Sequence, residues 1–451
     1  MPSPTILRAG FASRDITPPL GHPNSLGGRQ HPVEEIWEPL CVEVVVIDDG
    51  TARALLAGFD LCGLLEEDHR HLREDMGAAA GVDAEAVVAN SSHTHSAPYL
   101  SSALDRLLRP LGLENSDPAY VAAVRAAAAE AAASAVAALE AVDAVRVGHG
   151  RVIRVAANRR PQVDGETVHR HGRPAESALR DLPEGLIDPE VHVVSFDRAD
   201  GTAIGTIAAY ACHPTAAGGD FHGWLTPDFV GPARSRTERS TGAPVLFLQG
   251  CGGNCGTGKW IAGTPAEDVA GMGARLAEGI AEGLARAAPV EIGRLQVAAR
   301  RVPTPLDPEG RLTDHVGLEA DLTAVAATGD ISKAHEVGDR LIFARQVADG
   351  WLPRVVAVRA GDLALVSLPG EQFVDFALQV RAGSPFAETI VAGYDDNSLQ
   401  YVPSLEAFPH GGYEVDGGWR YVAPGGGEII AEAAIDLLRE MVPGPGRQRS
   451  G

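Results

Sequence analysis

The sequence predicts a mixed α/β (α+β) fold in which several layers of buried sheet are covered by helices. Runs rich in Val, Ile and Leu alternate along the whole chain with Ala-rich runs of helical length. Strands this apolar are typical of sheets buried on both faces. With 451 residues, 45% of them hydrophobic, the chain can bury a large core. It contains no sequence repeat and no linker that would divide it, so residues 1–442 are expected to form one domain and residues 443–451 a flexible tail.

Nine segments are predicted as strands, and four runs carry helix signals. The strands are residues 42–47, 54–59, 86–89, 191–196, 204–211, 245–248, 355–358, 363–368 and 389–392. The helices are expected at 118 to about 142, from 265 onwards, at about 318–347 and at 428–441. Asp117-Pro118 and Thr264-Pro265-Ala266-Glu267 are typical helix starts. The segment 161–190 lacks a period and is expected to be a long loop, of the kind that often serves as a lid or binding loop.

Charge and composition exclude several classes of protein. The balance of 60 acidic against 38 basic residues gives a net charge of −22, which argues against nucleic acid as a partner. The N-terminus lacks the basic and apolar regions of an export signal, and no uninterrupted apolar run is long enough to predict a membrane segment, so a cytoplasmic location is expected. Five scattered cysteines predict no disulfide framework. A homo-oligomer is compatible with the sequence.

Polar residues recur where predicted strands end. They are Asp60, His93 and His95, His213, Gln249, Glu371 and Tyr394. Sites in α/β sheets gather outside the carboxyl ends of strands, so these side chains are expected to share one active site. In the motif Ser92-His93-Thr94-His95, the two histidines are two positions apart. In an extended segment, side chains at positions i and i+2 project to the same face.

The residue types in this set point to a metal. Histidines from two strands and a carboxylate suit Zn²⁺ better than Ca²⁺ or Mg²⁺, and hydrolytic zinc sites keep an open position for water. Other interpretations stay open, because the two histidines of the pair can lie on a solvated edge and Glu371 can cap a helix. Asp60 and Asn90 are candidates to orient the ligand histidines.

Several motifs resemble the neutral, non-lysosomal ceramidases and their shorter bacterial relatives. They lie in the family's order and span nearly the whole chain: Arg14-Asp15-Ile16-Thr17-Pro18-Pro19, Phe59-Asp60-Leu61-Cys62-Gly63, Ser92 to Pro98, Asn158-Arg159-Arg160-Pro161, Cys212-His213-Pro214-Thr215, Leu368-Pro369-Gly370-Glu371, Tyr401-Val402-Pro403 and Gly412-Tyr413-Glu414.

The resemblance implies a ceramidase-like catalytic domain and the hydrolysis of an amide bond. It implies one Zn²⁺ per chain, bound by His93, His213, Glu371 and Tyr401. His95, Arg159 and Tyr413 match the family's catalytic and substrate-contacting positions.

Two departures from the family bear on mechanism and substrate. Gly250 stands where the family's Phe-x-x-Ser-Asn-x-Gly motif has its serine, which favours metal-activated water as the nucleophile, and Cys251 has no obvious base beside it. The chain also ends without the immunoglobulin-like domain of full ceramidases. The expected substrate is therefore a soluble N-acyl compound, a small-molecule amide, rather than membrane ceramide.

Alternative functions remain. The same zinc site would serve an esterase or lactonase, or a non-catalytic metal-binding relative. Gly253 to Lys259 matches most of a nucleotide-binding P-loop. However, Trp260 occupies the next position, where a P-loop has a Ser or Thr whose hydroxyl binds magnesium. His169-Arg170-His171 is expected to be solvated surface, with a lid as the other interpretation. A structural role is expected for six histidines: His22, His31, His149, His192, His222 and His315.

Overall fold

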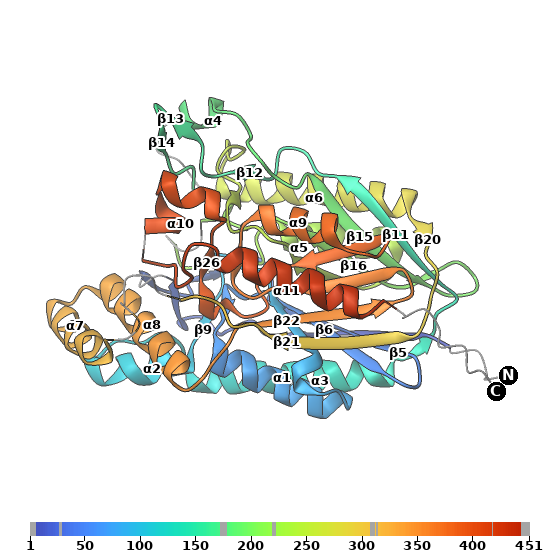
Figure 1. Ribbon diagram of the computed structural model, residues 1–451, viewed down its shortest axis with the longest axis horizontal. Helices are drawn as coiled ribbons and strands as arrows, with labels where there is room; N and C mark the ends of the chain where they lie inside the picture. The colour runs from blue at the N-terminus through green and yellow to red at the C-terminus, as the bar shows by residue number, and fades with distance from the viewer. Residues whose placement is uncertain are drawn as a thin grey trace.

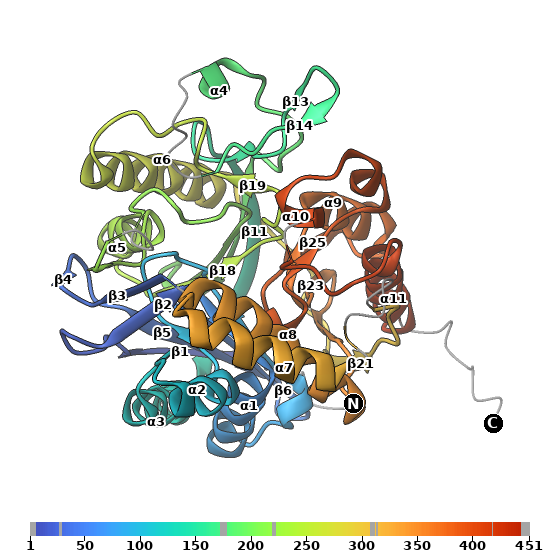
Figure 2. The same ribbon diagram turned by 90° about the vertical axis from the view of Figure 1, so that its left-hand side faces the viewer.

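Three larger sheets, wrapped by helices, form the protein (Figures 1 and 2). The computed structural model describes residues 6–26, 29–171, 178–218, 222–306, 312, 314–416 and 418–442, so the predicted tail lies outside the described residues. The mixed α/β class predicted from the sequence is confirmed.

All nine predicted strands are confirmed, three in each large sheet. The first sheet contains β1 (Arg8–Asp15), β5 (Cys41–Asp48), β6 (Arg53–Phe59) and β8 (Val87–Ser91), with β10 (Glu140–Ala141) at its edge. The second contains β11 (Ala144–Arg151), β15 (Glu190–Asp197), β16 (Ala203–Tyr210) and β18 (Val245–Gln249), with β20 (Ala288–Pro289) at its edge. The third contains β21 (Leu295–Arg301), β22 (Arg354–Ala360), β23 (Leu363–Ser367) and β25 (Glu388–Ala392).

The three sheets repeat one topology. In each, the strands lie in chain order, the first three pair antiparallel, and the last pairs parallel to the third. A helix connects each parallel pair: α1 (Glu66–Ala80), α5 (Val230–Thr241) and α9 (Val374–Gly383). The sequence shows no repeat because buried apolar residues are interchangeable, so the topology recurs without recurring residues.

A second set of helices covers the outer strands in the same repeated way. α3 (Pro118–Ala137) packs on β1 and β5, α6 (Pro265–Arg286) on β11 and β15, and α11 (Gly426–Glu440) on β21 and β22. The predicted starts are confirmed, because Asp117 caps α3 and Thr264 forms a capping box with Glu267. α3 ends five residues earlier than predicted. It is long and apolar enough to cross a membrane, and one of its faces, which includes Val124 and Ala128, is buried in the core of the first sheet.

The single helix predicted at 318–347 is wrong. The structure has α7 (His315–Thr328) and α8 (Ile331–Ala348) instead. Gly329 adopts a left-handed φ of 75° that ends α7, and the Asp330 side chain accepts a hydrogen bond from the Lys333 N–H at 2.9 Å, which starts α8. A C-terminal glycine followed at once by an N-cap breaks a helix without interrupting its apolar pattern.

Short elements complete the described chain around the ends of the sheets. The ladders are β2 (Pro23–Leu26) with β3 (Arg29–Pro32), β4 (Glu35–Ile36) with β17 (Trp224–Leu225), β7 (Gly63–Leu64) with β9 (Tyr99–Leu100), β12 (Ala157–Asn158) with β19 (Cys255–Gly256), β13 (Gln162–Val163) with β14 (Glu166–Thr167), and β24 (Glu371–Gln372) with β26 (Tyr401–Val402). The short helices are α2 (Ser102–Leu108), α4 (Ala178–Asp181) and α10 (Tyr413–Asp416). The predicted loop at 161–190 thus carries β13, β14 and α4, and its residues 172–177 lie outside the described chain.

Asn90 joins the three sheets where their last strands end. Its Nδ2 donates to the carbonyls of Gln249 and Gly393, and its Oδ1 accepts from the Gln249 N–H at 2.8 Å. The Gly393 N–H in turn donates to the Gln249 carbonyl at 2.9 Å. Below this junction, one buried apolar cluster contains side chains of all three sheets, among them Val88, Leu246 and Ile390. The carboxyl ends of β8, β18 and β25 are therefore fixed against one another.

Candidate active site

His93, His213 and Glu371 meet at the carboxyl ends of the strands, and each comes from a different sheet. His93 follows β8, His213 follows β16, and Glu371 follows β23. The Glu371 Oε2 lies 3.0 Å from the His213 Nε2 and 3.4 Å from the His93 Nε2. All three side chains are buried. The repeated topology therefore brings together residues that lie up to 278 positions apart in the sequence (371 − 93).

The backbone turns sharply to aim these side chains. His93 has a φ of 62°, in the left-handed region that residues other than glycine rarely adopt. Tyr394, which occupies the corresponding place after β25, has a φ of 54°. Such conformations cost on the order of 1–3 kcal/mol each and concentrate at functional sites.

Backbone carbonyls set the tautomers of both histidines. The His93 Nδ1 lies 2.6 Å from the Cys62 carbonyl oxygen, and the His213 Nδ1 lies 2.7 Å from the Gly252 carbonyl oxygen. Because a carbonyl oxygen only accepts, each Nδ1 carries the proton and each Nε2 presents a lone pair towards Glu371. Burial raises the pKa of Glu371, but the positive charge that His93 and His213 carry when protonated lowers it more, so its net pKa lies well below the usual range.

Three electron-pair donors thus face one another in a buried space. They repel unless a cation lies among them, and two imidazoles with one carboxylate fit Zn²⁺. Ligands at about 2.0–2.1 Å from a tetrahedral zinc lie about 3.3 Å apart. The Glu371 Oε2 lies 3.0 Å from the His213 Nε2 and 3.4 Å from the His93 Nε2, and both distances are close to that spacing of zinc ligands.

His95 and Tyr401 stand at the edges of this cluster. The His95 Nε2 lies 3.3 Å from the His93 Nε2, so the two histidines face the same space, although the left-handed φ of His93 shows that the segment between them is not the extended one assumed from the sequence. Tyr401 pairs in register with Glu371 across β24 and β26, and its ring is nearly parallel to that of His213, at a centroid distance of 6.2 Å. Tyr413 lies farther out. Its ring centroid is 5.7 Å from that of Tyr401, and the residue is 40% exposed.

Arg159 is a buried cation beside the cluster. It is 1% exposed, its Nε lies 2.8 Å from the Glu414 Oε1, and its guanidinium lies 5.0 Å from the centre of the Tyr401 ring. Burial lowers the pKa of Arg159, but Tyr401, Glu414 and Glu371 raise it more, so the net pKa lies above its ordinary value. Burial raises the pKa of Glu414, which Arg159 and other cations nevertheless hold below its usual value. Both partners therefore stay charged.

The expectation that His169-Arg170-His171 is solvated surface is wrong. Arg170 is 1% exposed and donates to the carbonyls of Asn158 at 2.6 Å and Leu182 at 3.2 Å. The buried guanidinium thus holds the loop together through hydrogen bonds to its backbone carbonyls. The segment therefore folds inwards, a feature that a sequence without periodicity does not reveal.

This inward folding places two histidines beside Arg159. The His171 Nδ1 lies 3.3 Å from the Arg159 Nη1, and its ring centroid lies 5.7 Å from that of His95. His169 stacks on His171 at 4.9 Å. Burial and the neighbouring Arg159 lower the pKa of His169 to about 4, so it is neutral at pH 7.

Tyr394 is a site residue that the predicted ligand set omits. Its hydroxyl lies 3.3 Å from the His213 Nδ1, and its ring centroid lies 4.7 Å from that of His93. The sequence contained a signal for it, because Tyr394 is among the polar residues that follow predicted strands.

The residues expected to orient the ligand histidines make other contacts. Asp60 accepts from Arg234 at 2.7 Å and from the Cys41 N–H, while Asn90 forms the junction of the strands. Glu371 does not cap α9, which begins at Val374.

The stretch after β18 offers neither a nucleophile nor a phosphate loop. A Cβ at Gly250 would lie 3.0 Å from the Ala211 Cβ, so a serine there would be tightly packed. Cys251 is fully buried, and burial raises the pKa of its thiol to about 12. The Lys259 Nζ donates to the Arg180 and Leu182 carbonyls, and the next helix begins only at Pro265. A P-loop needs a helix that begins at its lysine.

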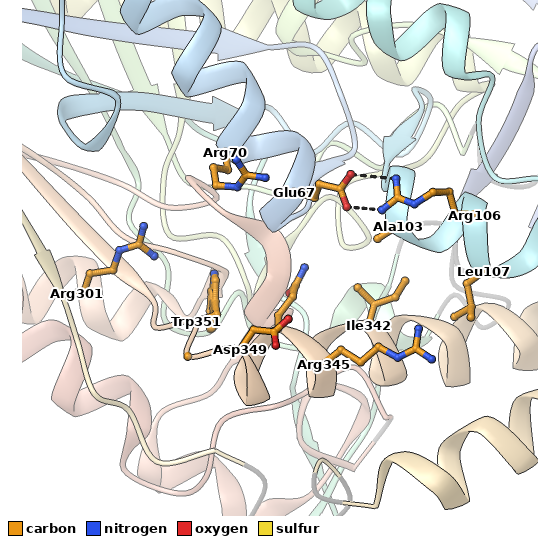
Figure 3. A pocket seen from close by; sticks show the side chains of 12 residues that line it. Glu67, Arg70, Ala103, Arg106, Leu107, Arg301, Ile342, Arg345, Asp349 and Trp351 are labelled. Carbon is orange, nitrogen blue, oxygen red and sulfur yellow. Dashed lines mark hydrogen bonds and ion pairs between the residues drawn. The ribbon is translucent and has the colours of Figure 1, made fainter.

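A separate cavity of about 630 Å³ lies between α1, α2 and α8 (Figure 3). It is lined by four arginines, each paired with a carboxylate: Arg70 with Glu74, Arg106 with Glu67, Arg301 with Glu85 and Arg345 with Glu319. The guanidinium charges are therefore largely compensated, and no residue of the histidine cluster lines this cavity.

Comparison with solved structures identifies the fold. The neutral ceramidase from Pseudomonas aeruginosa matches with a TM-score of 0.72 and 20% identity, over 98% of this chain and 75% of that one. A ceramidase complexed with C2 matches with a TM-score of 0.70 and 19% identity, over 97% of this chain and 76% of that one. No model of a known protein family and no curated protein matches. The fold is that of bacterial neutral ceramidases, which confirms the resemblance seen in the motifs at the level of the fold.

Proposed function

We propose that the protein is a zinc-dependent hydrolase that cleaves the amide bond of a soluble N-acyl compound. The observation that carries the proposal is the meeting of the His93, His213 and Glu371 acceptor atoms, one from each sheet, at separations of 3.0 and 3.4 Å. The ceramidase-like fold supports a hydrolase that acts on carbon–nitrogen bonds.

His93, His213 and Glu371 would hold the metal, with Tyr401 as the fourth ligand. When bound, Zn²⁺ polarises a carbonyl and lowers the pKa of a bound water towards neutrality. The Cys62 and Gly252 carbonyls keep the two histidines in the tautomer that metal binding needs.

Arg159 and His95 would stabilise the charge that develops on the carbonyl oxygen of the substrate. Both side chains are buried and adjoin the cluster, and Arg159 keeps its charge because Glu414 and Tyr401 surround it. A fixed cation in a site that excludes water stabilises a developing oxyanion without reorganising in the reaction. Tyr413, half-exposed beside Tyr401, would contact the part of the substrate farther from the reacting bond.

The polar surroundings of the cluster favour a small or anionic acyl group over a long alkyl chain. In the described part of the chain, Arg159, Arg160, His169 and His171 lie together around the Glu414 carboxylate, and Glu371 also acts on Arg159. A long hydrocarbon chain packed against these groups would displace water from them without offering a hydrogen bond, at a cost of about 1–3 kcal/mol for each group left unsatisfied. An ester or lactone would contact the same residues. The preference for amides over esters is therefore a separate part of the proposal, which substrate assays test.

The nucleophile in this proposal is water rather than a side chain. Gly250 lacks a hydroxyl and Cys251 is protonated at pH 7. Replacing Cys251 by alanine should therefore leave most turnover intact, whereas a covalent mechanism through the thiol would abolish it.

The proposal is tested with metal-stripped protein and a panel of substrates. Short-chain N-acyl amines, N-acyl amino acids, the matching esters and ceramide are offered before and after one equivalent of Zn²⁺ is restored. We expect turnover only with zinc and a higher kcat/KM for the polar N-acyl compounds than for ceramide. Full turnover in stripped protein would exclude metal catalysis. Stoichiometric zinc without turnover of any substrate would indicate a non-catalytic relative.

A further inference from the structure

A second pair of histidines stands outside the candidate active site. His149 in β11 and His192 in β15 are directly opposite each other in the antiparallel ladder. Their Nδ1 atoms lie only 2.9 Å apart. The other nitrogen of each ring faces a carboxylate: the His149 Nε2 lies 2.9 Å from the Glu388 Oε2, and the His192 Nε2 lies 3.3 Å from the Asp188 Oδ2.

These contacts fix where the protons are. An ionised carboxylate only accepts, so each Nε2 donates its N–H outwards and each Nδ1 is left with a lone pair. Asp188 also accepts from the Arg381 guanidinium at 2.6 Å, a contact that a carboxylate makes in its ionised form. Two lone pairs therefore face each other at 2.9 Å, and a positive species between them is needed to remove their repulsion.

A third electron-pair donor, Glu190, lies close to the two histidines. A carboxylate oxygen of Glu190 and one nitrogen of each histidine all lie within 4.8 Å of one another. Of the two carboxylates that hold the histidines, Asp188 is itself held: it accepts from the Glu190 N–H at 3.1 Å and from the Arg381 guanidinium at 2.6 Å. The side chain of His149 is 34% exposed and Glu190 lies at the surface, so a cation can enter from solvent.

We propose that His149, His192 and Glu190 bind a second divalent cation through the two Nδ1 atoms and the Glu190 carboxylate. Two imidazoles and one carboxylate select Zn²⁺ and its neighbours Co²⁺ and Ni²⁺ over Ca²⁺ and Mg²⁺. The Glu388 and Asp188 contacts reproduce the carboxylate–histidine–metal arrangement that orients ligands and raises their basicity. The site shares no residue with the proposed catalytic cluster.

The position of this site indicates a structural role. His149 and His192 belong to the second sheet, Glu388 begins β25 in the third sheet, and Arg381 lies in α9. A cation between the histidines would link these elements through one continuous set of contacts. Its binding should stabilise the folded state, since the unfolded chain does not preform the site.

The test separates the two sites by mutation. Full-length, tag-free protein with His93→Ala and Glu371→Gln lacks the catalytic cluster, and it is dialysed against Zn²⁺ alone and assayed for bound metal. We expect one zinc per chain in this background, and none after His149→Ala is added. A Glu388→Gln substitution should weaken binding about 10–100-fold. The exposed His410→Ala substitution is the matched control and should leave the metal content unchanged.

Three results would overturn the proposal. The background protein binds no zinc, or His149→Ala retains it, or zinc does not raise the melting temperature of the background protein. The first result would leave a shared proton between the rings as the positive species. His149→Ala in the otherwise native chain should keep the circular dichroism spectrum and the cooperative unfolding of the native chain, which shows that the variant folds. Failure of the catalytic proposal does not affect this outcome, because the readout is metal content and melting temperature.

Discussion

Glu371 and Tyr401 face each other as a register pair in the parallel ladder of β24 and β26, and the Glu371 N–H donates to the Gln400 carbonyl at 2.8 Å. This short ladder fixes two of the four predicted metal ligands relative to each other through the backbone. The Tyr401 ring then lies alongside His213, which reaches the cluster from a different sheet. The site is therefore preorganised by hydrogen-bonded backbone as well as by side-chain packing.

Replacing Arg159 by lysine should reduce catalysis more than substrate binding. Lysine keeps the charge but loses the planar guanidinium that contacts both Glu414 and the Tyr401 ring. We expect kcat to fall by about 10²–10³-fold, the range for loss of one oxyanion donor, with a smaller change in KM. Steady-state kinetics with a polar N-acyl substrate provides the measurement. Arg14→Lys on β1 is the control, and equal kinetics for both variants would refute the assigned role.

Replacing Asn90 by alanine should destabilise the fold without removing a ligand. The substitution deletes the hydrogen bonds to Gln249 and Gly393 and leaves buried backbone groups unsatisfied. We expect the free energy of unfolding to fall by about 3 kcal/mol, measured by urea denaturation. For Asn115→Ala, which loses the side-chain bonds to the Tyr99 carbonyl at 3.3 Å and the Ser101 carbonyl at 3.5 Å, the fall should be smaller. A change within about 0.5 kcal/mol for Asn90→Ala would contradict its role as the junction of the three sheets.

Asp339 should make stability depend on pH. Burial raises the pKa of this carboxyl to about 8, far above its unfolded value of about 3.9. The folded state then binds more protons than the unfolded state between about pH 4 and pH 8, so stability falls as pH rises through that range. Asp339→Asn should remove most of this loss and be more stable than the native chain at pH 8, by a few kcal/mol as an order of magnitude. Denaturation at pH 5 and pH 8 tests this, and parallel pH dependences in the two proteins would contradict it.

Of the four long strands in each large sheet, the sequence predicted the second, third and fourth along the chain and missed the first. The nine predicted segments are apolar at nearly every position, because they are covered on both faces. The three missed strands, β1, β11 and β21, mix exposed and buried positions and carry Arg, His or Gly. Such half-exposed strands have a weaker apolar signal, and only their pairing with a buried neighbour identifies them as strands.

The candidate site was predictable where it follows strand ends and unpredictable where it depends on loops. His93, His213 and Glu371 follow buried strands, so their convergence could be expected from strand polarity alone. His169 and His171 reach Arg159 only because Arg170 binds the carbonyls of its own loop from inside. The structural role predicted for His149 and His192 did not include their cross-strand contact, because register is not visible in a sequence without a turn signal.

Zinc content and turnover of Glu371→Gln test the central claim most directly. Glutamine keeps the volume of the side chain but removes the charge that joins His93 and His213 in one cluster. We predict that the catalytic zinc is lost, that turnover of N-acyl compounds falls to background, and that His149→Ala, measured in parallel, keeps turnover. Undiminished turnover by Glu371→Gln protein, with zinc content equal to that of the native chain, would contradict the account.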